Sequence, residues 1–139
     1  MLDDVAERCS AIEECYEFML AYAAQGLPAS EGNEAGGQLR HFLGRAVKAL
    51  SGLSGAYAKA VEHEQPEAVG PYRSFLAVLD RDANDSLAAM QLVLAQPSIS
   101  SQLIDNLNAS IHLRALLTDL FLVDELLKQR LSANPAATS

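Results

Sequence analysis

His41 is the side chain whose type and surroundings best fit group-transfer chemistry. Leu39, Leu43 and Ala46 are spaced by four and three residues, which indicates the apolar stripe of a helix, and His41 falls on the opposite side of that helix. An exposed imidazole that is flanked by small residues and cations is what accepting and holding a phosphoryl group requires. His41 is therefore a candidate phosphotransfer residue.

The five residues His41-Phe42-Leu43-Gly44-Arg45 resemble the His-x-Leu-Lys-Gly signature of histidine-containing phosphotransfer domains, which are acidic four-helix modules of similar length. The resemblance implies that His41 is the phosphoacceptor. The lysine and glycine of the signature are replaced by Gly44 and Arg45, so a bulky side chain stands where the family's glycine clears space one turn after the histidine.

The segment 35–61 is cationic in an otherwise acidic chain. It contains Arg40, Arg45, Lys48 and Lys59 and no Asp or Glu, whereas the whole chain has a formal net charge of −8. A partner protein therefore meets this segment differently from its neighbours. We predict a partner-binding surface made of His41, Arg45, Lys48 and Lys59.

A purely structural explanation of the same segment stays open. Gly37, Gly44, Ser51 and Ala58 are spaced by sevens, which allows a neighbouring helix to pack closely against them. The cations would then balance the negative charge of the acidic residues in the first helix.

The chain lacks the patterns of a metal or catalytic centre. A carboxylate-bridged two-metal site on a bundle needs Glu-x-x-His on two helices, and no histidine here has a glutamate three residues before it. Glu13 and Glu17 are expected to be solvated surface carboxylates. Cys9 and Cys15 point about 120° apart on one helix, so we expect free thiols. We predict no catalytic residue, no metal and no cofactor.

Asp105, His112 and Asp119 form a polar stripe along the last predicted helix. They are spaced by sevens and therefore share one face, but successive members lie about 10 Å apart along the axis, which is too far for a hydrogen bond. A stripe of this kind is typical of a solvent-facing or register-setting feature.

Four helices are predicted from apolar residues that recur every three or four positions. Glycine and proline mark the breaks between them, at 26–28, 64–66 and 97–98. A serine, Ser98 or Ser100, is expected to cap the last helix. The predicted helices cover residues 2–25, 38–63, 70–96 and a last segment that runs to about 131.

These elements predict an all-α fold, an antiparallel four-helix bundle with up-down-up-down topology, and the alternative is two long hairpins that are completed only in a dimer. We expect one domain at residues 1–132 and a disordered C-terminal tail at residues 133–139. The last helix has apolar residues around its whole circumference, which three neighbours in a monomer cannot easily cover. We therefore expect a homodimer with an interface at Leu113, Leu116, Leu117, Leu120, Phe121 and Leu127.

Composition narrows the function classes. An acidic chain is a poor ligand for nucleic acid, and no apolar run approaches the length of a membrane span. The N-terminus does not resemble a signal peptide, so we expect a cytoplasmic location. The leading hypothesis is a non-enzymatic dimeric adaptor, chaperone-like protein or regulatory subunit. Phosphotransfer through His41 is the alternative, and a small-ligand or metal-binding bundle enzyme comes third.

Overall fold

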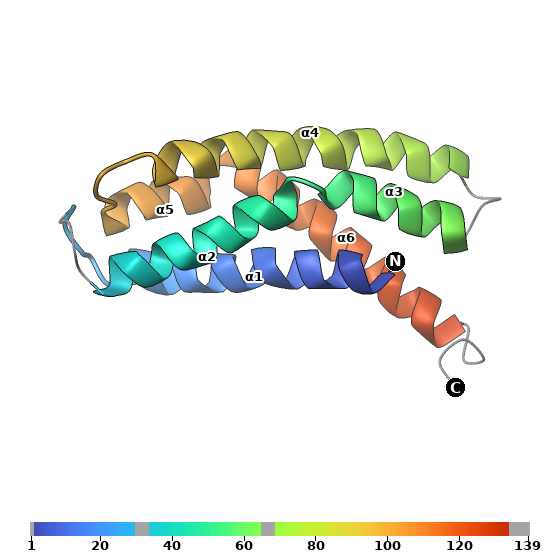
Figure 1. Ribbon diagram of the computed structural model, residues 1–139, viewed down its shortest axis with the longest axis horizontal. Coiled ribbons are helices and arrows are strands. Elements are labelled where there is room, and N and C mark those ends of the chain that lie inside the picture. The colour runs from blue at the N-terminus through green and yellow to red at the C-terminus, as the bar shows by residue number, and fades with distance from the viewer. Residues whose placement is uncertain (1, 30–33, 65–68, 134–139) are drawn as a thin grey trace.

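The computed structural model describes residues 2–29, 34–64 and 69–133, and this part of the chain is all-helical with no strand. Six helices follow one another in it where four were predicted, because the second and the fourth predicted helices are each interrupted once (Figure 1). In chain order they are α1 (Leu2–Ala24), α2 (Glu34–Leu50), α3 (Leu53–Glu64), α4 (Val69–Leu94), α5 (Ser101–Ala109) and α6 (Ile111–Ala133).

α1 and α2 lie side by side and run in opposite directions. Near the start of α1, the guanidinium of Arg8 donates a hydrogen bond of 2.9 Å to the carbonyl oxygen of Ala49, near the end of α2. Further along α1, the ring of Phe18 stacks on the ring of Phe42, with centroids 4.7 Å apart. Figure 1 shows α2 and α3 end to end, with α4 alongside both.

The interruption of the second predicted helix lies at Ser51 and Gly52. A Cβ atom on Gly52 would lie only 2.9 Å from the guanidinium of Arg8, so glycine leaves the room that Arg8 needs to reach Ala49. The positive guanidinium stabilises the C-terminal carbonyls of α2. The prediction of one continuous helix over 38–63 is therefore wrong, although the apolar pattern continues through the break.

The interruption of the fourth predicted helix lies at Ser110. Its backbone N–H donates to the carbonyl oxygen of Leu107 at 3.1 Å and ends α5, while its Oγ accepts from the N–H of Leu113 at 3.3 Å and begins α6. Ser100 caps the start of α5 in the same way, since its Oγ accepts from the N–H of Leu103 at 3.0 Å. Of the two predicted caps, Ser100 is the one used.

The predicted apolar stripe of the second helix is confirmed on both sides of its break. Every residue of that stripe is buried: Leu39, Leu43, Ala46, Leu50, Leu53, Tyr57 and Ala60. This break therefore interrupts the helix, but the same apolar residues that were predicted to enter the core still do so.

Ser101 joins the end of α1 to the start of α5. Its Oγ donates a hydrogen bond of 2.6 Å to the carbonyl oxygen of Tyr22 and accepts one of 2.7 Å from the N–H of Leu27. Its own N–H donates to the carbonyl oxygen of Leu27 at 2.9 Å. The phenol of Tyr22 donates to the carbonyl oxygen of Ile99. This buried junction fixes where α5, and with it α6, begins relative to α1.

α6 crosses the other helices at an angle, and its C-terminal part extends past the N-terminal end of α1 (Figure 1). The division into a domain at 1–132 and a tail at 133–139 stays a prediction. α6 includes Ala133, and the rest of the predicted tail lies outside the described residues.

Candidate binding cleft between α1 and α6

The four residues of the predicted partner-binding surface are all exposed: His41, Arg45, Lys48 and Lys59. Arg45 also forms an ion pair of 3.1 Å with Glu14 on α1. Both side chains are about half exposed, so this pair contributes little to stability. Partner binding by this surface stays a prediction.

Arg40, the remaining cation of the basic segment, has a structural role. Its guanidinium donates hydrogen bonds of 3.0 Å to the carbonyl oxygen of Leu94 and 2.6 Å to that of Gln96, at the C-terminal end of α4. The positive charge there complements the negative end of the helix dipole. Part of the cationic segment therefore joins α2 to the end of α4.

Close helix packing does not explain the glycines of the basic face. A Cβ atom on Gly37 or Gly44 would have no atom of the described residues within 4 Å, so none of the described helices approaches the backbone there. The packing explanation is wrong for these two positions. The same explanation also expected the cations to balance the acidic residues of the first helix, and the ion pair between Arg45 and Glu14 is one such contact.

The predicted dimer residues fall into two groups. Four leucines are buried within the single chain: Leu113, Leu116, Leu117 and Leu120. The chain's own α1, α4 and α5 pack against α6 and cover these four leucines, and the dimer interface stays a prediction. Phe121 is 63% exposed. The side chain of Leu127 lies outside the described residues.

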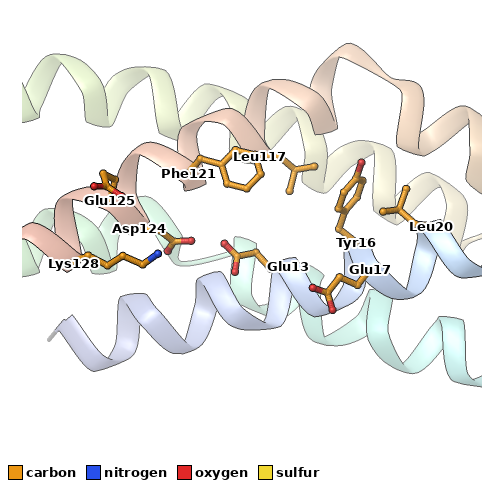
Figure 2. Close-up of a pocket in the computed structure, with 9 residues that line it drawn as sticks. All are labelled: Glu13, Tyr16, Glu17, Leu20, Leu117, Phe121, Asp124, Glu125 and Lys128. Carbon is orange, nitrogen blue, oxygen red and sulfur yellow. The ribbon is translucent and has the colours of Figure 1, made fainter.

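A cleft of about 550 Å³ opens between α1 and α6 (Figure 2). One end of it is apolar, with Tyr16 and Leu20 from α1 and Leu117 from α6. Phe121 lies near the middle of the α6 side. The other end is charged, with Glu13 from α1 and Asp124, Glu125 and Lys128 from α6, whereas Glu17 lies beside Tyr16.

Two facing carboxyl groups, Glu13 on α1 and Asp124 on α6, mark the charged end of the cleft (Figure 2). A hydrogen bond between them requires a proton on one of the two, and together with partial burial and the negative charge of Asp124 it raises the pKa of Glu13 to about 7. Oε1 of Glu13 is buried and has no hydrogen-bond partner among the described residues. The pair therefore takes up a proton as pH falls through about 7.

A second carboxyl pair joins α6 to α4. Asp119 is buried, and within the part of the chain that the structure describes its Oδ2 has no hydrogen-bond partner. Burial raises its pKa to about 7, with further contributions from a hydrogen bond to the carboxyl group of Asp82 and from the charge of Asp82. This pair lies outside the cleft lining, and we assign it a role in pH-dependent stability rather than in binding.

Sequence reasoning missed both carboxyl pairs. Glu13 was expected to be solvated, and Asp119 was expected to share a face with Asp105 and His112, but those two side chains are exposed whereas Asp119 is buried. The break at Ser110 places Asp105 on a different helix, α5, whereas His112 and Asp119 share α6 and differ because α4, with Asp82, packs against α6 at Asp119. An acid within the leucine-rich run 113–127 was the available signal for a buried carboxyl group.

The two cysteines are not candidates for nucleophilic chemistry. Cys9 and Cys15 are free and buried, and burial raises the pKa of each thiol to about 12. Both thiols are therefore protonated near neutral pH. Within the described ranges, no group of three or more His, Cys, Asp or Glu side chains is placed to hold a metal ion.

No family model matches the chain, and neither the curated proteins nor the solved structures include a match to it. Among the helices described by the structure, none combines the length and apolar character needed to cross a membrane.

Proposed function

We propose that the chain is a non-enzymatic binding protein that works as a homodimer, as an adaptor, chaperone-like protein or regulatory subunit for a protein partner. The fold in this proposal is an antiparallel four-helix bundle whose second and fourth helices are each interrupted. The two buried free thiols support a reducing, cytoplasmic location.

The exposed apolar side of α6 is the observation that carries the proposal. Ile111 is 75% exposed, Leu122 is 52% exposed, and Leu126 follows one turn later with 37% exposed. Their spacings of eleven and four residues place all three on one side of the helix. Exposed apolar side chains that gather on one element usually mark an interface. A second copy of the chain presents the same side of α6, as a two-fold dimer requires.

Light scattering tests the dimer directly. We expect the purified protein to have about twice the chain mass of 14.9 kDa, and we expect Leu122→Glu to reduce it to monomer, because the substitution places a charge in the apolar contact. Leu92→Glu is the matched control, since Leu92 is also an exposed leucine, at 65%, but belongs to α4 and not to α6. A wild-type protein that is monomeric at tens of micromolar would contradict the dimer.

Phosphotransfer through His41 is a second candidate, favoured by one observation. His41 is exposed on α2, and the glycines one turn to either side, Gly37 and Gly44, face open space, so the imidazole is accessible. Arg45, one turn after His41, is engaged with Glu14.

His41→Ala separates the two functions. For a binding protein, we expect the substitution to change the free energy of unfolding by no more than about 0.5 kcal/mol, as exposed substitutions do, and to leave dimer mass unchanged. We also expect no acid-labile phosphate on the wild type after incubation with a phosphorylated receiver domain. Labelling of the wild type that disappears in His41→Ala would establish phosphotransfer instead.

A further inference from the structure

We propose that the cleft between α1 and α6 binds a cationic amphipathic helix of the protein partner. This inference rests on the proposed function, because it identifies the kind of partner that the binding protein takes. In this arrangement the partner helix occupies the cleft. The second copy of the chain in the dimer packs on the side of α6 that carries Ile111, Leu122 and Leu126.

The apolar end of the cleft has the form of a groove for one helix. Tyr16 and Leu20 are one turn apart on α1, and Leu117 and Phe121 are one turn apart on α6, so an apolar ridge stands on each side. Leu20 is 47% exposed and Phe121 is 63% exposed. An amphipathic helix that lays its apolar stripe between two such ridges would cover both side chains.

The charged end of the cleft determines whether the partner helix is cationic or anionic. Four carboxyl groups line the cleft as a whole, three of them at this end, and among the described lining residues one ammonium group, that of Lys128, accompanies them. Because the chain as a whole is also acidic, a cationic segment is attracted from a distance and an acidic one is repelled. The partner helix therefore carries lysine or arginine next to its apolar stripe.

The facing carboxyl groups of Glu13 and Asp124 provide the contact point for such a cation (Figure 2). Both side chains are partly exposed, and in the free protein the pair takes up a proton as pH falls through about 7. A lysine ammonium or arginine guanidinium that reaches their accessible oxygens donates to both carboxylates at once. The shared proton then leaves to solvent, so binding of the cation releases up to one proton.

The length of the cleft favours a helix over a small ligand. Its lining runs from Glu13 to Leu20 on α1 and from Leu117 to Lys128 on α6, which corresponds to about 10 to 16 Å along the helix axes. A ligand that reaches both the apolar and the charged end must extend over about two to three helical turns. One amphipathic helix does so with residues on a single face.

The binding test uses a fluorescein-labelled synthetic helix with leucine at positions i, i+3, i+4 and i+7 and lysine on the flanking positions, titrated with the protein and followed by fluorescence anisotropy. We expect saturable binding, and we expect Leu20→Asp to weaken it about tenfold or more, because the charge disrupts the apolar ridge. Leu92→Asp is the matched control for an exposed leucine outside the cleft, and we expect it to bind like the wild type.

Three further measurements make the result specific. A peptide of the same composition without the apolar stripe should bind at least about tenfold more weakly. Titration calorimetry of the wild type near pH 6, in two buffers of different ionisation enthalpy, should detect proton release, and Glu13→Gln should abolish it. Hexylammonium chloride should not displace the peptide at comparable concentration.

Several outcomes would overturn the inference. These are equal affinities of wild type and Leu20→Asp, equal binding of the peptide without a stripe, proton release that persists in Glu13→Gln, or displacement by hexylammonium at comparable concentration. Light scattering on the same proteins keeps the two proposals apart. A dimer that fails to bind the peptide contradicts only this inference, whereas a monomer that binds it contradicts only the proposed dimer.

Discussion

Replacement of Ser101 by alanine is expected to lower the free energy of unfolding by about 2 to 3 kcal/mol. The hydroxyl of Ser101 is buried and makes two hydrogen bonds, to the carbonyl oxygen of Tyr22 and from the N–H of Leu27. Alanine leaves both backbone groups without these partners inside the protein, which costs more than the loss of an exposed bond. Urea denaturation monitored by circular dichroism measures the change.

Ser54→Ala is the control for this substitution. Ser54 also donates a hydrogen bond, to Asp80 at 2.8 Å, but that bond is exposed, so we expect a change below about 0.5 kcal/mol. If the two variants had equal stability, the junction between α1 and α5 would not have the structural role inferred from its hydrogen bonds.

The stability of the protein is expected to contain a contribution that falls as pH rises from about 5 to about 8. When the pH lies between the ordinary carboxyl pKa and the raised pKa of about 7, the folded protein binds a proton that the unfolded chain has already released. This holds for Glu13 beside Asp124 and for Asp119 beside Asp82. The stabilising contribution is therefore complete below the ordinary carboxyl pKa and is lost as pH rises through about 7.

Neutral substitutions reveal this contribution. At pH 8 we expect Asp119→Asn to raise the free energy of unfolding by about 2 kcal/mol and Glu13→Gln by about 1 kcal/mol, the smaller value because the cleft exposes Glu13 to solvent screening. At pH 5 both variants should match the wild type more closely. Thermal melts at both pH values measure the difference.

Asp105→Asn is the control for the pH experiment, since Asp105 is an exposed carboxylate on α5. We expect it to melt like the wild type at both pH values. An Asp119→Asn variant that is less stable than the wild type at pH 8 would show that the buried carboxyl group prefers its charged form, contrary to the sign derived above.

The sequence was sufficient to predict the helical content and the core of the second predicted helix. Leu50 and Leu53 are both buried although a turn separates them, because the turn keeps the spacing of the apolar residues. Because this spacing continues across the turn, the apolar pattern gave no indication of where the helix is interrupted. Gly52 was visible as a weak helix former, but the guanidinium of Arg8 that occupies the space above it comes from a distant part of the chain.

The cleft was harder to predict for a related reason. Glu13 and Asp124 are far apart in sequence, and neither one alone differs from a solvated acid. What raises the pKa of Glu13 is the position of α6 against α1, and that position depends on the break at Ser110 and on the junction at Ser101. Local patterns do not contain tertiary relations of this kind.

The burial of Cys9 and Cys15 has a kinetic consequence. Both thiols lie in the interior face of α1, so a thiol-alkylating reagent has no access to them while α1 is packed against the other helices. Their alkylation requires an opening event, and its rate depends on the population of the open form when closing is fast. The chain therefore contains two natural reporters, six residues apart, of how often its first helix separates from the rest of the protein.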